Sequence, residues 1–152
     1  MSQENVEIVR RTFQEFMDLL AAIPGDEPAT HVERYGDVPA LIERFESTIE
    51  WDFSRFVGWP EEQVYYGHEG LVKFWRAYLS AWGSIVWDLD EFFDAGDQVV
   101  VFVRQRARGR TSGVDTEYPP YAQLWTLRDG KIVRFAAYSD RDEALEAAGL
   151  RA

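Results

Sequence analysis

Apolar residues near the N-terminus recur at the spacing of an amphipathic helix. The pattern predicts a helix over Ser2–Ala22. The next segment, Ile23–Asp37, combines Pro, Gly and charged residues and is expected to be a loop. Asp37 resembles a helix cap, so a short second helix is expected from there through Phe45. The residues on the apolar face of the first helix are Val6, Val9, Phe13, Phe16, Met17 and Leu20.

The spacing of apolar residues along the chain then changes twice. Thr48–Phe53 alternates between apolar and charged residues, which predicts a strand. From Glu69 a broad apolar face returns at helical spacing, and Gly67 and Gly70 suit a tight entry into that helix. The residues of this second face are Leu71, Phe74, Trp75, Tyr78, Leu79 and Trp82.

The second half of the chain is dominated by alternation with a period of two. Ile85–Phe93 and Val99–Gly109 flank the turn sequence DAGDQ and predict a long hairpin. Arg110–Glu117 is expected to be a loop, and Tyr118–Leu127 and Ile132–Ser139 are expected to be two more strands.

The end of the chain predicts a short closing helix. Asp140 and Glu143 have the spacing of a capping box, and the helix is expected to run to Ala148. Helices are therefore segregated from a mostly antiparallel sheet, which is typical of the α+β class. A strongly curved sheet wrapped around the first helix makes a cone with an internal hollow. The length fits one domain over residues 1–152.

One strand of the predicted hairpin is apolar on both faces. In Val99–Val103 every residue is Val or Phe, so both sides of the strand are expected to be covered. The helices supply one cover, and a second subunit is the expected source of the other, which favours a homodimer. Farther along the same strand, arginines alternate, which predicts a solvated or salt-bridged face: Arg104, Arg106, Arg108 and Arg110.

Composition narrows the classes of partner. The net charge of −11 argues against nucleic acid and against anionic membrane surfaces. The chain contains no Cys, so disulfides, thiol nucleophiles and thiolate metal sites are excluded. No signal-like or membrane-spanning run is present, and a cytoplasmic protein is expected. No motif for a metal or an organic cofactor is found. An aromatic share of 15% indicates an aromatic core or a ring-lined cavity.

The order of these elements resembles the SnoaL-like family, the polyketide cyclase-like branch of the nuclear transport factor two-like superfamily. The segments that carry the resemblance are NVEIVRRTFQEF, IEWDF, YYGHEGLVKFW, DAGDQVVVFVRQRARGRTSG and AQLWTLRDGKIVRFAAYSDRDEAL. The resemblance covers nearly the whole chain and implies a cone-shaped α+β barrel. The fold hosts cyclases, isomerases, hydrolases, dehydratases and binders without catalytic activity. The segment from Ile23 to Asp37 is longer than is usual in the family.

The resemblance also implies which residues face the hollow. Odd-numbered positions of the last strands are expected inside, including Val133, with matching positions on the earlier strands and the helix. Few polar groups lie among them, which suits a flat, mostly apolar ligand. Alternatively, the rings fill the hollow completely. The expected pocket residues are Trp51, Phe53, Trp75, Tyr78, Val103, Gln105, Tyr121, Gln123, Trp125, Phe135 and Ala137.

The acidic residue used by catalytic relatives is missing. Cyclases and epoxide hydrolases of the superfamily carry an inward-facing aspartate on the last strand, and its position here is Ala137. The Arg and Asp of the hydrolases fall near Val103 and Gln105. Asp140 is out of phase with the inward-facing positions of the last strand, and it suits a helix cap. His68 is the remaining acid/base candidate, although a histidine before a helix also suits capping or solvent exposure.

Three functions remain open on these grounds. The first is a protein that binds a small hydrophobic molecule without chemistry. The second is a cyclase, isomerase or hydrolase that acts on a small apolar carbonyl or epoxide compound, with Gln105, Gln123 and Tyr121 polarising an oxygen and His68 or a water moving the proton. The third is a structural dimer. Whether the protein is an enzyme is left open by the sequence.

Overall fold

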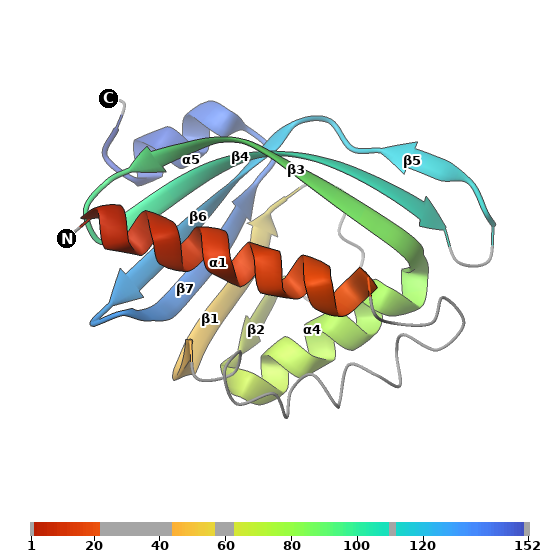
Figure 1. Ribbon diagram of the computed structural model, residues 1–152, viewed down its shortest axis with the longest axis horizontal. Coiled ribbons are helices and arrows are strands. Elements are labelled where there is room, and N and C mark those ends of the chain that lie inside the picture. Colours follow the sequence, from red (N-terminus) through yellow and green to blue (C-terminus); the bar gives the residue numbers. More distant parts are fainter. Residues whose placement is uncertain (1, 22–43, 57–62, 110–111, 151–152) are drawn as a thin grey trace.

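The computed structural model describes residues 2–21, 44–56, 63–109 and 112–150, with only the backbone described at 2–3, 19–21, 76 and 78–84. The elements follow one another in the order shown in Figure 1. They are α1 (Ser2–Ala21), β1 (Phe45–Arg55), β2 (Val64–Tyr66), α4 (Gly67–Ala81), β3 (Trp82–Asp94), β4 (Gln98–Gly109), β5 (Asp115–Glu117), β6 (Tyr121–Arg128), β7 (Lys131–Tyr138) and α5 (Arg141–Ala147).

The strands form one curved sheet of seven strands in the order β2-β1-β7-β6-β4-β3, with β5 paired to β4. Among the described strands, β1 and β7 pair in parallel and the other pairs are antiparallel. Helices α1 and α4 lie against one side of this sheet, and α5 lies on the opposite side (Figure 1). The fold is therefore the predicted α+β cone, with a mostly antiparallel sheet wrapped around helices. Among the described helices, none is long and apolar enough to cross a membrane.

The two faces of β4 belong to two separate clusters of buried side chains. Val99, Val101 and Val103 pack into the large inner cluster with residues of α1 and α4. Val100 is fully buried in a smaller outer cluster, which includes Ala144 of α5. The two-sided apolar pattern is thus explained at Val100 by a helix of the same chain. The homodimer inferred from that pattern stays a prediction.

Several boundaries differ from those expected. Phe45 begins β1 and does not end a helix, because it is buried beside the sheet and pairs with Ile132 of β7. Trp82 begins β3, where it pairs with Gly109. Strands β2 and β5, three residues each, are too short to show a period in the sequence. The expected loop over 23–37 lies outside the described residues, and so does the short helix that follows it, except for Arg44 and Phe45.

One expected inward position on β7 is wrong. The pairing of β6 with β7 shifts register between Thr126 and Leu127, because Thr126 pairs with Arg134 and Leu127 pairs with Ile132, which skips Val133. Ile132 is therefore fully buried in the inner cluster, whereas Val133 is only partly buried and lies outside it. The expected alternation holds again from Phe135 onward.

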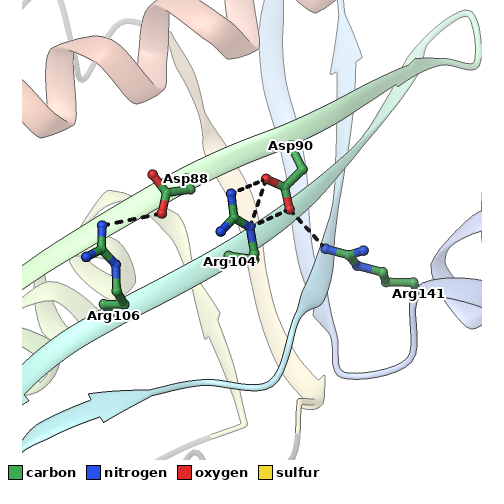
Figure 2. A network of polar contacts seen from close by, with 5 residues as sticks. All are labelled: Asp88, Asp90, Arg104, Arg106 and Arg141. Atoms are coloured by element: carbon green, nitrogen blue, oxygen red, sulfur yellow. Dashed lines mark hydrogen bonds and ion pairs between the residues drawn. The ribbon is translucent and has the colours of Figure 1, made fainter.

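The arginines of β4 form ion pairs on the outer face of the sheet, as predicted (Figure 2). The guanidinium of Arg104 donates to both carboxylate oxygens of Asp90 at 2.8–3.0 Å, which lowers the pKa of Asp90. Arg141 of α5 reaches the same carboxylate at 3.5 Å. Arg106 lies 3.5 Å from Asp88. Arg104 and Arg106 are thus matched by carboxylates of β3, and Arg108 pairs with Asp115 of β5 at 2.8 Å. These three arginines therefore do not form a free basic surface.

Candidate ligand cavity

Regular alternation on the strands projects large side chains into the concave side of the sheet. On β1, Trp51 and Phe53 point inward, and on β6, Tyr121, Gln123 and Trp125 do the same. The strand register places these residues next to one another, because Trp51 pairs with Phe135 of β7 and Phe135 pairs with Trp125. Sequence positions far apart therefore converge on one aromatic interior.

The rings of this interior are closely packed. Trp51 stacks on Phe135 with ring centroids 4.0 Å apart and meets Trp125 edge-on at 6.0 Å. Phe53 stacks on Phe74 of α4 at 4.9 Å. Such pairs stabilise a core beyond the burial of their area, by about 0.5–1.5 kcal/mol each. The aromatic cluster is thus a large part of what holds the helices on the sheet.

A small cavity remains inside the cluster. Its volume is about 40 Å³. This space is large enough for water molecules and too small for an aromatic ring unless side chains move. The residues that line it are Phe13, Phe16, Trp51, Phe53, Phe56, Phe74, Trp75, Trp87, Gln105, Tyr118, Tyr121, Gln123, Trp125 and Phe135.

A chain of hydrogen bonds joins the polar groups on the cavity wall. The hydroxyl of Tyr121 and the indole N–H of Trp87 both donate to Oε1 of Gln105, at 2.7 and 3.0 Å. Nε2 of Gln123 donates to the hydroxyl oxygen of Tyr121 at 3.3 Å. The indole N–H of Trp125 donates to Oε1 of Gln123 at 3.1 Å. Two buried amides and a phenol are therefore held in fixed orientations in an apolar setting. We call these five residues the polar relay.

Burial sets the protonation state of Tyr121. Desolvation of the charged form raises the pKa of this phenol well above its ordinary value, although the hydrogen bond from Gln123 opposes the shift. Tyr121 is therefore a neutral phenol at neutral pH and acts as a hydrogen-bond donor, not as a base.

The cavity wall is poor in groups that carry protons. Among the described lining residues, Tyr118 and Tyr121 alone are titratable, and no carboxylate, imidazole or ammonium is present. Within the described part of the chain, no three His, Asp or Glu side chains are grouped to hold a metal ion. Ala137, at which the family resemblance leads to the expectation of an aspartate, is fully buried in the same cluster.

Most of the expected pocket residues converge on this cavity. Val103 and Ala137 are fully buried in the surrounding cluster but do not line it. The side chain of Tyr78 lies outside the described part of the structure. That any of these residues contacts a ligand stays a prediction. The expected residues that line the cavity are Trp51, Phe53, Trp75, Gln105, Tyr121, Gln123, Trp125 and Phe135.

The two acid/base candidates have structural contacts elsewhere. Nε2 of His68 lies 2.9 Å from the carbonyl oxygen of Phe45, and it must donate because a carbonyl only accepts. This bond ties the first turn of α4 to β1, and His68 does not line the cavity. Asp140 caps α5 as predicted, and its carboxylate accepts from the backbone N–H groups of Asp142 and Glu143.

Five lining residues were not expected there: Phe13, Phe16, Phe56, Trp87 and Tyr118. The helical periodicity placed Phe13 and Phe16 on an apolar face without indicating what that face meets. The inward direction of Trp87 could have been predicted from the sequence, since it alternates with Ile85 and Leu89 on the same face of β3. Phe56 and Tyr118 lie in irregular segments beside strands. Tyr118 was expected to begin a strand, but β6 starts only at Tyr121, so alternation does not fix the direction of Tyr118.

Comparison with solved structures identifies the fold of the chain. An NTF2-like protein of unknown function from Burkholderia pseudomallei superposes with a TM-score of 0.69 and 17% identity, covering 94% of this chain and 95% of that one. A putative SnoaL-like polyketide cyclase from Jannaschia gives a TM-score of 0.64 and 19% identity over 99% and 94%. TerC, co-crystallised with polyporic acid, gives a TM-score of 0.57 and 21% identity over 81% and 99%.

Sequence comparison gives the family. A comparison with curated proteins finds no match. The family model for the SnoaL-like domain matches residues 29–135. That match spans most of the chain, and it agrees with the cone-shaped fold and with the neighbours of known structure. The protein therefore belongs to the SnoaL-like domain family.

Proposed function

We propose that the interior of the cone binds a small, flat, mostly apolar organic molecule and does not transform it by carboxylate or imidazole acid/base catalysis. The observation that carries this proposal is the cavity wall itself. Aromatic rings surround a few oriented polar groups, which is the composition of sites that bind apolar ligands in a defined orientation. A core needed only for stability is better served by apolar residues than by buried amides, because each buried amide must be hydrogen-bonded.

The cavity must widen before such a molecule enters. Four lining rings are only partly buried: Phe16, Phe56, Trp75 and Tyr118. They pack against one another or against the inner rings; Phe16 stacks on Trp75 at 4.8 Å and Phe56 meets Tyr118 at 5.9 Å. Rings at this boundary have fewer neighbours to displace than Trp51 or Phe135, which are almost fully buried. Entry therefore proceeds by rotation of the partly buried rings, while the inner rings keep their positions.

The absence of an acid or base on the described wall supports binding over turnover. A general base must lie within hydrogen-bond reach of the proton that it removes. His68 is engaged with Phe45, Ala137 carries no polar group, and Tyr121 stays protonated. The neutral hydroxyl of Tyr121 can polarise a carbonyl, but proton removal then has no partner among the described lining residues. The cyclase, isomerase or hydrolase alternative stays a prediction that no contact favours.

A fold neighbour is consistent with this use of the interior. TerC, which shares the cone fold, was co-crystallised with polyporic acid. The likeness at 21% identity supports the shared fold. The choice of ligand for the present chain depends on its own wall residues.

Native mass spectrometry of freshly purified protein tests the proposal. We expect a population whose mass exceeds that of the chain, and solvent extraction should release an organic molecule of low polarity. Gln123→Leu removes a lining amide and should lower this occupancy. Gln98→Leu is the matched control, since Gln98 lies outside the cavity and contacts Thr126. Ligand-free protein that also shows no calorimetric binding of indane or 1-indanone at millimolar concentration would make the proposal wrong.

A further inference from the structure

The indole N–H of Trp51 is a deeply buried donor in the wall of the interior. Trp51 is 3% exposed, and its Nε1 finds no hydrogen-bond acceptor within the described part of the structure. The indoles of Trp87 and Trp125, which line the same cavity, donate to Gln105 and Gln123. The ring of Trp51 is held in place by stacking on Phe135 and edge contacts with its neighbours. Its direction is therefore set by packing and not by a bond at the nitrogen.

A buried donor without an acceptor raises the free energy of the unliganded fold. More than nine in ten buried polar groups in folded proteins have a partner, so each exception calls for an explanation. The amide oxygens of the polar relay accept from Tyr121, Trp87 and Trp125, and none of them bonds the indole of Trp51. Trp51 lines the cavity, so a molecule held there is in a position to provide the acceptor.

The charge of that acceptor is restricted by the same wall. Among the described lining residues there is no Lys, Arg or His. A carboxylate or phosphate placed beside Trp51 would be an unpaired ion in an apolar interior, which is strongly unfavourable. A neutral oxygen with lone pairs, such as that of a ketone or quinone, satisfies the N–H without this cost.

We propose that Trp51 selects the ligand of this cavity through its indole N–H, and that the ligand is a neutral aromatic carbonyl compound whose oxygen accepts that bond. The inference rests on the proposed function, since it requires that the interior binds a molecule. It adds the chemical class of the ligand and a residue that distinguishes it. The aromatic rings bind the flat hydrocarbon part, and Trp51 gives the carbonyl compound its advantage over the hydrocarbon alone.

A matched pair of probes isolates the contribution of this bond. Indane and 1-indanone are similar in size and shape, and they differ in the carbonyl oxygen. By isothermal titration calorimetry, we expect 1-indanone to bind the native protein about two- to tenfold more tightly than indane, the range expected for one hydrogen bond. In Trp51→Phe, which keeps an aromatic ring and removes the donor, this ratio should fall to about one.

Trp125→Phe is the matched control variant. It makes the same change of ring in the same wall, at an indole whose N–H is already bonded to Gln123. We expect it to weaken both probes while the preference for 1-indanone is kept. A loss of the preference in Trp125→Phe equal to that in Trp51→Phe would overturn the assignment to Trp51.

The native protein provides a readout that does not depend on either variant folding. In a ¹H–¹⁵N spectrum, the indole resonance of Trp51 is assigned from its through-space contacts with Phe135. We expect 1-indanone to move this N–H proton downfield, as a new hydrogen bond does, and indane to leave it nearly unchanged. Equal affinities for the two probes, or an unmoved resonance in saturating 1-indanone, would overturn the inference and leave the proposed function standing. Failure of both probes to bind to protein that also purifies without a ligand would overturn the two together.

Discussion

At the scale of single residues, Tyr121 is the centre of the polar relay. Its hydroxyl donates to Gln105 at 2.7 Å and accepts from Gln123 at 3.3 Å. Tyr121→Phe keeps the ring but leaves buried amide groups without their partner, so we expect a loss of about 1–3 kcal/mol in the free energy of unfolding. Tyr66→Phe is the control, because Tyr66 is 67% exposed and should change stability by less than about 0.5 kcal/mol. Urea unfolding measures both, and equal effects would contradict a structural role for the relay.

The same substitution carries a prediction for alkaline pH. The pKa of Tyr121 is raised in the folded protein by burial, whereas in the unfolded chain it is about 10. Below that pH both states hold the proton, and the stabilisation is fully present. As the pH rises above it, the unfolded chain loses a proton that the folded chain keeps, so stability falls. The difference in unfolding free energy between native protein and Tyr121→Phe should therefore shrink by about 1.4 kcal/mol per pH unit above pH 10.

The candidate site shows how far residue patterns reach. Alternation on β6 and β7, together with the family resemblance, places Tyr121, Gln123, Trp125 and Phe135 correctly toward the interior. It cannot show that the oxygens and N–H groups of the relay meet one another, because this depends on side-chain rotamers. Nor can it show that Trp51 differs from Trp125 in having no acceptor. The side of the sheet to which a side chain points follows from the alternation along the strand, whereas its hydrogen-bond partners follow from packing in three dimensions.

At the scale of elements, the junction between β2 and α4 depends on Gly67. This residue has φ = +69°, and an added Cβ would lie 3.2 Å from the carbonyl oxygen of Ser47. Gly96 has φ = +81° in the turn between β3 and β4, but its Cβ would meet nothing within 4 Å. Gly96→Ala should thus cost about 1–2 kcal/mol from backbone strain alone, and Gly67→Ala about 2–3 kcal/mol, because it adds the contact with Ser47.

Thermal or urea unfolding of the two glycine variants measures this difference. The comparison is matched, since both positions require a positive φ and differ in what surrounds the added methyl group. If Gly67→Ala lowers the free energy of unfolding no more than Gly96→Ala does, the backbone of β1 at Ser47 moves aside at no cost in stability.

The elements themselves were predicted to different extents, for identifiable reasons. Long strands and helices with a sustained period, such as α1 and β4, were correctly placed. Strands β2 and β5 were missed because three residues cannot establish alternation. Val133 was placed inward because a strict period of two was assumed across a register shift. Phe45 was assigned to a helix because nothing in its local sequence shows its pairing with Ile132, far along the chain.

At the scale of the whole molecule, the covering of the outer sheet face changes the interpretation of the two-sided strand. Helix α5 buries Val100, Leu124 and Ala136 from outside. The neighbouring part of the same face is charged, with Arg104 and Arg106 paired to carboxylates of β3 (Figure 2). The chain therefore buries the apolar part of this face with its own last helix, and the short sequence from Arg141 to Ala147 matters more to the architecture than its length indicates.

The net charge of −11 predicts how stability responds to salt. The ion pairs described above are largely exposed, and such pairs contribute little individually. Repulsion among the excess carboxylates acts over a longer range and disfavours the compact state. Raising NaCl from about 0.01 to 0.1 M shortens the screening length from about 30 to 10 Å, so we expect the urea midpoint at pH 7 to rise.

The isoelectric point supplies the control for this last prediction. Near pH 4.6 the net charge is close to zero, and the long-range repulsion that salt screens is nearly gone. The same change in NaCl should then leave the urea midpoint almost unchanged. A midpoint that falls with salt at pH 7 would mean that the carboxylate–guanidinium pairs of the outer face, Arg104–Asp90 foremost, outweigh the excess negative charge. In that case the fall with salt should be weaker or reversed in Arg104→Ala, because that substitution removes the guanidinium that bonds both oxygens of Asp90 and adds to the excess negative charge.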